Sequence, residues 1–367
     1  MTNAVIFPGK YFQGKGLLND IGKYVSIYGA KPFLLWEDFL SQSLKPAFSK
    51  SFEEYRITPT DASFTGETTR KAVEQWNNTV REAHCDVIIG LGGGKTIDAA
   101  KAIAAQTGLR CIIIPSIASN DAPTSACTVW YREDGEYDGF ELWKNNPDMI
   151  LVDSELLAAA PVRYFVAGMG DALATWPEAK AAYSTRAVSC AGGTPTLAAM
   201  TLARLCFETI LNYGLEARDA VLNRLVTPAV EKVLEANILL SGIGWESGGL
   251  ATAHAIANSL PAIHETHGLL HGEKVAFGLV TQLCLDPDVE MNEVYEITDF
   301  LIAVGLPVTF EQMNMKDVAE ERLFEFAKSV SGEGSFSRNH PFIVEPTDIV
   351  TAMKAADSLG RRRTFHS

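Results

Sequence analysis

The stretch from Cys85 to Ala102, CDVIIGLGGGKTIDAAKA, limits the fold more than any other part of this sequence. Its apolar run predicts a buried strand, the glycines at 92–94 predict a tight turn, and the alanine-rich end predicts a helix. Glycines let backbone amides approach a ligand closely, and the first turn of a helix presents unpaired N–H donors. The stretch therefore predicts a parallel α/β unit whose turn binds a phosphate-bearing cofactor.

This turn matches neither of the two common phosphate-binding motifs completely. A Walker loop needs four residues between its first glycine and the GK pair, but only three separate Gly90 from Gly94. The dinucleotide motif GxGxxG requires a glycine where Lys95 stands. A phosphotransferase is disfavoured on this ground, and a tight turn without a ligand stays open. Glu37, at the end of an earlier predicted strand, is placed to accept hydrogen bonds from an adenosine ribose, which would disfavour NADP.

The order of predicted elements indicates two domains. Up to about residue 155, helical patterns alternate with the apolar runs KPFLLWE, CDVIIGLG, RCIIIPS and DMILVD, which is typical of a parallel sheet with crossover helices. After Pro161 the apolar spacing is helical throughout. The chain has 367 residues, longer than one core comfortably supports. We therefore predict an α/β nucleotide-binding domain over 1–159 and an all-α domain over 160–367.

Composition and charge exclude several classes of function. The formal net charge of −14 repels phosphate backbones, so neither nucleic acid nor an anionic membrane is expected as a partner. No apolar run approaches the roughly 18 residues of a membrane span. The start lacks the pattern of a secretory signal, so we place the protein in the cytoplasm. The six cysteines have no CxxC spacing, which predicts neither a disulfide framework nor a cysteine zinc site.

Three residues far apart in the chain are of the types that bind a catalytic divalent metal: Asp171, His254 and His271. Catalytic zinc commonly has three protein ligands, with histidine and carboxylate among them, and one open position. A single histidine on an apolar helix is nevertheless more often a packed core residue. A competing pair, His264 and His267 in HETH, is one residue short of the HExxH metalloprotease spacing and is assigned to the surface or the pocket rim.

Six ordered segments resemble the glycerol dehydrogenase branch of the iron-containing alcohol dehydrogenase superfamily nearly end to end. They are FPGKYFQG, GLGGGKTIDAAKA, PSIASNDAPTSA, GMGDALATW, ESGGLATAHA and HGEKVAFG. The resemblance implies an α/β nucleotide-binding domain, a helical metal-binding and catalytic domain, and an active site in the cleft between them. It also implies bound NAD, one divalent metal ion, a small polyol substrate and a ring-like homo-oligomer such as an octamer.

By position, the resemblance assigns functional residues in this sequence. It assigns the metal ligands to Asp171, His254 and His271 and a substrate hydroxyl to Asp121, with Trp245 and the two histidines also at the substrate. Glu37 falls where the family has an aspartate on the adenosine ribose. The remaining cofactor contacts are assigned to the glycine turn and the segment that faces the nicotinamide: Gly93, Gly94, Lys95, Asp98, Ser116, Ser119, Ser125, Cys127 and Tyr131.

The sequence also departs from the family pattern. Thr175 stands where the iron-dependent members have a further histidine, so the resemblance implies a three-ligand site of the zinc type. Trp245 replaces the usual phenylalanine, Asn120 the usual threonine, and Ala257 a histidine that often follows the first ligand, which leaves the choice of alcohol open. Pro177 removes a backbone donor from the helix that carries the aspartate ligand and is expected to bend it.

The expected function is oxidation of glycerol to dihydroxyacetone, or of a related vicinal diol, by hydride transfer to NAD beside a zinc ion that lowers the pKa of the alcohol. A related dehydrogenase that acts on another diol or a 2-hydroxy acid stays open. A lyase similar to dehydroquinate synthase is disfavoured because its phosphorylated substrate needs basic side chains, and the histidine segments hold only Lys274. A catalytically silent NAD-binding protein is disfavoured because all three candidate ligands are present.

Overall fold

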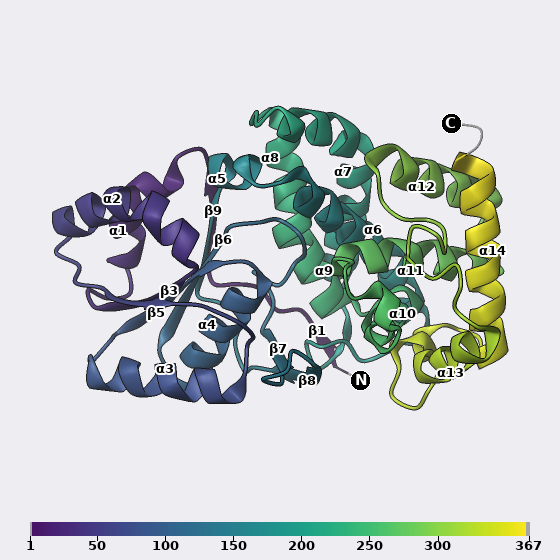
Figure 1. Ribbon diagram of the computed structural model, residues 1–367, viewed down its shortest axis with the longest axis horizontal. Coiled ribbons are helices and arrows are strands. Elements are labelled where there is room, and N and C mark those ends of the chain that lie inside the picture. The colour runs from purple at the N-terminus through teal and green to yellow at the C-terminus, as the bar shows by residue number, and fades with distance from the viewer. Residues whose placement is uncertain (1, 365–367) are drawn as a thin grey trace.

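The computed structural model describes residues 2–364 and has two parts (Figure 1). An α/β part, coloured purple and blue, holds the main sheet, and a helical part, coloured from teal to yellow, holds most of the remaining chain. The last strand of the sheet ends at Asp153, and the first long helix, α6, spans Val162–Thr185. The domain boundary at residue 159 stays a prediction.

The main sheet has six parallel strands in the order β2-β9-β6-β5-β3-β4. Their bounds are β2 Tyr11–Gly14, β3 Pro32–Trp36, β4 Thr60–Ser63, β5 Val87–Gly92, β6 Arg110–Pro115 and β9 Met149–Asp153. The four apolar runs predicted as strands are β3, β5, β6 and β9. Strands covered on both faces carry apolar side chains at successive positions, which is why these four could be predicted.

Alternate residues of the strands point to opposite faces of the sheet and build two cores. Leu34 and Ile89 pack on one face with helices α1 and α2, whereas Phe33 and Ile88 pack on the other with α3 and α4. The two helix pairs lie on opposite sides of the sheet in Figure 1. Their bounds are α1 Ile21–Val25, α2 Asp38–Glu54, α3 Arg70–Glu82 and α4 Gly94–Thr107.

The sheet has a topological switch point between β3 and β5. The chain leaves β3 toward β4 and leaves β5 toward β6, in opposite directions along the sheet. Ligands of such folds bind outside the carboxyl ends of the strands at this point. Gly92 at the end of β5 pairs with Pro115 at the end of β6, and the amide of Ser116 donates to the carbonyl of Gly92 (2.9 Å). The glycine turn and the predicted nicotinamide segment therefore begin side by side.

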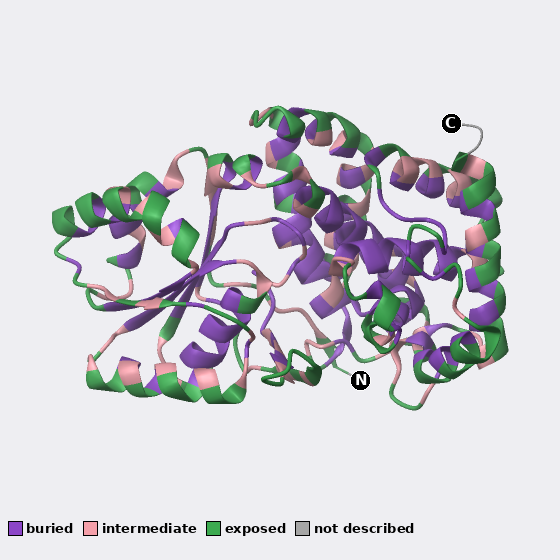
Figure 2. Cartoon of the chain, in the orientation of Figure 1, coloured by how far each residue is buried: buried purple, intermediate pink, exposed green. Residues whose placement is uncertain are grey.

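The second part is largely helical, as predicted. Buried residues concentrate in its central helices, where purple dominates in Figure 2. The helices from α5 onward, other than α6, are α5 Ser154–Ala159, α7 Leu197–Leu222, α8 Pro228–Glu235, α9 Ser241–Gly248, α10 Thr252–Ser259, α11 His271–Leu285, α12 Met291–Val304, α13 Glu320–Val330 and α14 Pro346–Thr364. Among the described helices, none is both long and apolar enough to cross a membrane.

Some details differ from the sequence-based expectation. The region after residue 160 contains a two-residue strand, β10 (Thr194–Pro195), which pairs in parallel with β1 (Asn3–Ala4) from the start of the chain. An antiparallel hairpin of β7 (Cys127–Tyr131) and β8 (Tyr137–Leu142) was also not predicted. Two-residue strands are too short to show a period. Helix α6 continues past Pro177 to its end at Thr185, and the expected bend at Pro177 stays a prediction.

Candidate metal and cofactor site

The three candidate metal ligands lie together on three helices. Asp171 is in the middle of α6, His254 is in the first turn of α10, and His271 is the first residue of α11. The Nε2 atoms of His254 and His271 lie 3.2 Å and 3.4 Å from Asp171 Oδ1. One ligand atom from each residue falls within 4.8 Å of the others. Residues separated by up to 100 positions in the sequence thus form one compact cluster.

Glycines beside the ligands allow the helices to approach this closely. A Cβ on Gly170, next to Asp171, would lie 2.4 Å from the carbonyl oxygen of Gly272, and a Cβ on Gly272 would lie 1.8 Å from that of Ala167. A Cβ on Gly278 of α11 would lie 2.5 Å from the carbonyl oxygen of Ala253, the residue before His254. Side chains at these positions would force the backbones apart. The glycines therefore set the separation of the ligands.

The donor set fits a divalent cation. Asp171 Oδ2 is buried and has no hydrogen-bond partner, so this oxygen is available to a ligand. Two imidazoles and one carboxylate are a ligand set found in catalytic zinc sites. Thr175, one helical turn after Asp171, supplies no fourth nitrogen, and its hydroxyl lies 3.4 Å from that of Ser241. The side chains present thus favour three protein ligands with an open position.

The ionisable groups of the cluster shift one another's pKa values. Burial and the nearby Asp171 raise the pKa of Asp121 well above its usual range. Although burial favours the neutral acid, the pKa of Asp171 is lowered because His271 and His254 face it. Burial also opposes the charged form of His254, but Glu178 and Asp171 raise its pKa well above the usual range. The carboxylates of Asp171 and Glu178 thus both face the imidazole of His254.

Asp121 connects this cluster to the α/β part. It lies in the segment after β6, and its Oδ2 accepts a hydrogen bond from Ser241 of α9 (2.6 Å). Trp245 lies one turn after Ser241 on the same helix and is half-buried. Its indole N–H is buried and has no partner. Asp121 is therefore bonded to α9, the helix that also carries Trp245.

The glycine turn lies where β5 ends and α4 begins. Glu37, directly after β3, accepts hydrogen bonds through Oε1 from the amide of Gly93 and the hydroxyl of Thr96, both 3.2 Å. A Cβ on Gly92 would lie 2.7 Å from the Thr96 side chain. Position 92 therefore has no room for a side chain, and Glu37 reaches the turn from the neighbouring strand.

Lys95 and Asp98 of α4 have partners within the protein. Lys95 Nζ pairs with Glu67 (2.5 Å) and lies 5.2 Å from the centre of the Tyr131 ring. Asp98 is buried, accepts a hydrogen bond from the amide of Val129 in β7 (2.9 Å) and pairs with Lys101 (2.8 Å). The carboxylate of Asp98 is thus engaged by β7 and its own helix. Its assignment to the cofactor stays a prediction.

The segment predicted to face the nicotinamide is mostly buried. Ser116, Ser119 and Ser125 are buried, and Ser125 Oγ lies 3.4 Å from Lys101 Nζ. Burial raises the pKa of the Cys127 thiol to about 12, so this cysteine is not a nucleophile at neutral pH. A Cβ on Gly94 would lie 3.5 Å from Asn120 Nδ2, so the amide of Asn120 faces the glycine turn.

Glu178 is the main residue of the site that sequence reasoning missed. It lies seven positions after Asp171 on α6, a spacing of two helical turns that puts both carboxylates on one face. Its Oε2 contacts His254 Nδ1 at a short hydrogen-bond distance. The seven-residue spacing from Asp171 was the signal in the sequence that could have pointed to Glu178. A carboxylate in an apolar helix after a candidate ligand is notable only once the facing histidine is known.

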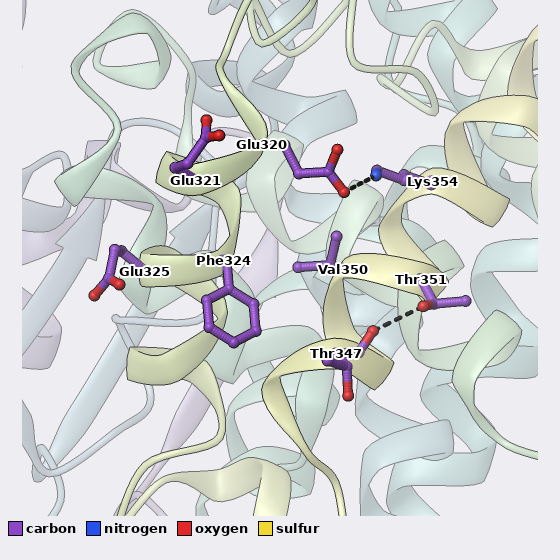
Figure 3. Close-up of a pocket in the computed structure, with 8 residues that line it drawn as sticks. All are labelled: Glu320, Glu321, Phe324, Glu325, Thr347, Val350, Thr351 and Lys354. Carbon is purple, nitrogen blue, oxygen red and sulfur yellow. Dashed lines mark hydrogen bonds and ion pairs between the residues drawn. The ribbon is translucent and has the colours of Figure 1, made fainter.

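Neither the histidine pair of HETH nor the groove between α13 and α14 contributes a residue to the metal cluster. His264 and His267 are exposed, with ring centres 4.7 Å apart, and His267 Nε2 contacts the carbonyl oxygen of Pro261. They lie at the surface, which is one of the two locations predicted from the sequence. A groove between α13 and α14, bridged by the Glu320–Lys354 ion pair (2.6 Å), lies at the far end of the helical part (Figures 1 and 3).

Comparison with known proteins agrees with the fold. Residues 8–154 match the family model for iron-containing alcohol dehydrogenase. The glycerol dehydrogenase of Thermotoga maritima is 42% identical over 364 residues, covering 99% of both chains. A glycolaldehyde reductase of Halobacterium salinarum is 37% identical with the same coverage. The crystal structure of glycerol dehydrogenase from Schizosaccharomyces pombe superposes with a TM-score of 0.95 at 34% identity, covering 100% of this chain and 93% of that one.

These full-length identities come from relatives that align with this chain across both of its parts, including the helices that hold Asp171, His254 and His271. Sequence identities of 34–42% over nearly the whole length, together with the same fold, assign the chain to one family. This chain belongs to the iron-containing alcohol dehydrogenase family.

Proposed function

We propose that this protein oxidises glycerol to dihydroxyacetone and transfers the hydride to NAD, with a divalent metal ion, zinc in our assignment, held by Asp171, His254 and His271. The observation that carries the proposal is the convergence of these ligands, with a free buried oxygen on Asp171, near Asp121. Full-length relatives named glycerol dehydrogenase in several organisms support glycerol as the substrate.

The cofactor is assigned to the switch point of the sheet. Amides of the glycine turn and the start of α4 would bind the pyrophosphate, with Lys95 nearby. Glu37, already hydrogen-bonded to the turn, would accept bonds from the adenosine ribose and repel the 2′-phosphate of NADP. The nicotinamide would then lie along Ser116–Tyr131, which begins beside Gly92. In this arrangement the nicotinamide would lie near Asp121, which belongs to the same segment.

The side chains divide the work on the substrate. A bound zinc ion, as a Lewis acid, makes an alcohol easier to deprotonate. Asp171, His254 and His271 hold that charge in place, while Asp121, fixed by Ser241, accepts a hydrogen bond from a second substrate hydroxyl. The buried setting of Asp121 and Asp171 excludes water and strengthens both interactions. A vicinal diol, with two neighbouring hydroxyls, suits this pair of contacts better than a simple alcohol.

A small hydroxyaldehyde or a related diol is the second candidate substrate. One full-length relative is named glycolaldehyde reductase, which supports this candidate. The same metal and cofactor chemistry serves both candidates, because reduction of the aldehyde is the reverse of oxidation of the alcohol.

The test is NADH formation by the purified protein with NAD and glycerol. The reaction is followed at 340 nm before chelation, after chelation and after zinc is restored, with propane-1,2-diol, ethylene glycol and a 2-hydroxy acid in parallel. We expect zinc-dependent turnover with the highest kcat/KM on glycerol. Higher kcat/KM on another alcohol would reassign the substrate, and a rate unaffected by complete metal removal would contradict the proposal.

A further inference from the structure

Glu178 of α6 has every oxygen in use although it is completely buried. Its Oε1 accepts hydrogen bonds from the backbone amides of Ala251 (2.8 Å) and His254 (2.9 Å) at the start of α10. Its Oε2 contacts the Nδ1 atom of His254. The relative exposure of the Glu178 side chain is 0%, so these contacts are not shared with solvent.

The imidazole of His254 is held between two carboxylates of the same helix. Asp171 faces its Nε2 atom at 3.2 Å, and Glu178, two turns further along α6, faces its Nδ1 atom. One ring is therefore gripped at both nitrogens by one rigid element. Rotation or flipping of the ring would break both contacts at once.

This arrangement selects a tautomer. An ionised carboxylate only accepts hydrogen bonds, so the Nδ1 atom must be the donor toward Glu178. In the neutral imidazole Nε2 then carries the lone pair, directed at Asp171 and the proposed metal position. Metal-binding histidines generally donate their other N–H to a carboxylate or carbonyl, which fixes the ring and makes it a better ligand.

We propose that Glu178 is a positioning residue that fixes His254 in the tautomer and orientation required to bind the metal ion. The inference rests on the proposed function, since it assumes that the cluster binds a divalent metal. The competing explanation is purely structural: Glu178 would only cap the first amides of α10.

The substitution Glu178→Gln separates the two explanations. A glutamine keeps a carbonyl oxygen for the amides of Ala251 and His254, so the cap survives. Its NH2 group then faces Nδ1 as a donor, which requires a lone pair there and moves the imidazole proton to Nε2. The nitrogen directed at the metal would be blocked. A capping role predicts normal zinc affinity, whereas the positioning role predicts weak binding.

The experiment measures zinc affinity by competition with a chromophoric chelator, using metal-free, full-length protein without NAD or glycerol. We expect Glu178→Gln to bind zinc about 10–100 times more weakly than the wild type. The matched control is Glu246→Gln. Glu246 is also a buried carboxylate with two hydrogen bonds, to the amide of Ala126 and to Asn146, but neither reaches a metal ligand. Its variant should keep wild-type zinc affinity.

Thermal unfolding of each metal-free variant shows whether it is folded. Wild-type zinc affinity in folded Glu178→Gln would overturn the inference. If that variant does not fold, Glu178→Asp replaces it: the shorter side chain withdraws the carboxylate from Nδ1, so zinc affinity should fall at least several-fold, and an unchanged value would overturn the inference. A wild-type protein that binds no zinc would instead refute the metal site, and with it the proposed function.

Discussion

Trp245 of α9 carries an unused hydrogen-bond donor. Its indole N–H is buried without a partner, one helical turn after the serine that holds Asp121. A buried donor without a partner is costly unless a ligand satisfies it. We therefore expect the N–H of Trp245 to bind the third oxygen of glycerol.

Replacement of Trp245 by phenylalanine tests this assignment, because it keeps an aromatic ring and removes the donor. We expect kcat/KM for glycerol to fall about tenfold, the effect of one lost hydrogen bond worth about 1–1.5 kcal/mol. The value for propane-1,2-diol, which lacks the third hydroxyl, should change little. An equal loss on both substrates would assign Trp245 a packing role only.

Glu37 joins the end of β3 to the glycine turn and is expected to exclude NADP. Substitution by serine removes the negative charge that would repel a 2′-phosphate, and it also removes the contacts with Gly93 and Thr96. We expect the KM for NAD to rise and the ratio of kcat/KM for NADP to that for NAD to increase about tenfold or more, about 1.4 kcal/mol. Steady-state kinetics with both cofactors would measure it, and an unchanged ratio would contradict the role.

The helix crossings around the metal cluster depend on backbone contacts that side chains would prevent. Gly272→Ala places a methyl group 1.8 Å from the carbonyl oxygen of Ala167, so α6 and α11 must separate and move Asp171 away from His271. We expect a loss of unfolding free energy at the upper end of about 1–3 kcal/mol, with weaker zinc binding. Gly268→Ala is the control, because a Cβ there meets nothing within 4 Å. Denaturant unfolding and zinc titration of both variants would decide, and a Gly272→Ala protein as stable as the control would refute the argument.

The elements of this fold were predictable where a single physical signal dominates. The strands β3, β5 and β9 are buried along their whole length, so they appear in the sequence as continuous apolar runs. The strands β1 and β10 are two residues each and depend on a contact between residues 3 and 194, which no local pattern encodes. Helix α6 continues through Pro177, which is buried together with most of the residues around it.

The candidate site was predictable in its residue types but not in its geometry. Asp171, His254 and His271 were identified by chemistry and by resemblance, while their approach to within 4.8 Å depends on glycine contacts between helices. Glu178 could not be identified because the histidine that it contacts lies 76 positions away in the sequence. The orientation of Asp98 toward β7 likewise follows from the hairpin, which the sequence did not predict.

The molecule as a whole is joined at the segment after β6. By sequence this segment belongs to the α/β part, yet its residues are bonded to the helical part. Thr124 donates to the carbonyl of Ile238 (2.6 Å), Asn237 donates to the carbonyl of Ala118 (3.3 Å), and Ser241 donates to Asp121. The segment that would contact the nicotinamide is therefore positioned by the same helices that adjoin the metal ligands.

Glu246 offers a way to loosen this joint without touching the metal. Its two oxygens accept hydrogen bonds from the amide of Ala126 (2.7 Å) and from the side chain of Asn146 (2.5 Å). In a glutamine one of these oxygens is replaced by an NH2 group, which cannot accept, so one of the two hydrogen bonds is lost. Because Ala126 lies between Ser125 and Cys127, we expect Glu246→Gln to raise the dissociation constant for NAD about tenfold, for a lost hydrogen bond to a charged group worth about 1.5 kcal/mol.

Zinc affinity of Glu246→Gln in the absence of NAD should stay at the wild-type value, since neither hydrogen bond of the Glu246 side chain reaches a metal-binding residue. Fluorescence titration with NAD and chelator competition with zinc measure the two quantities separately. Glu178→Gln should give the opposite pattern, with weakened zinc binding and a smaller effect on NAD measured without metal. If each variant impaired both affinities equally, the cofactor segment and the metal cluster would be one cooperative unit, and the separation of their two supports on α6 and α9 would be refuted.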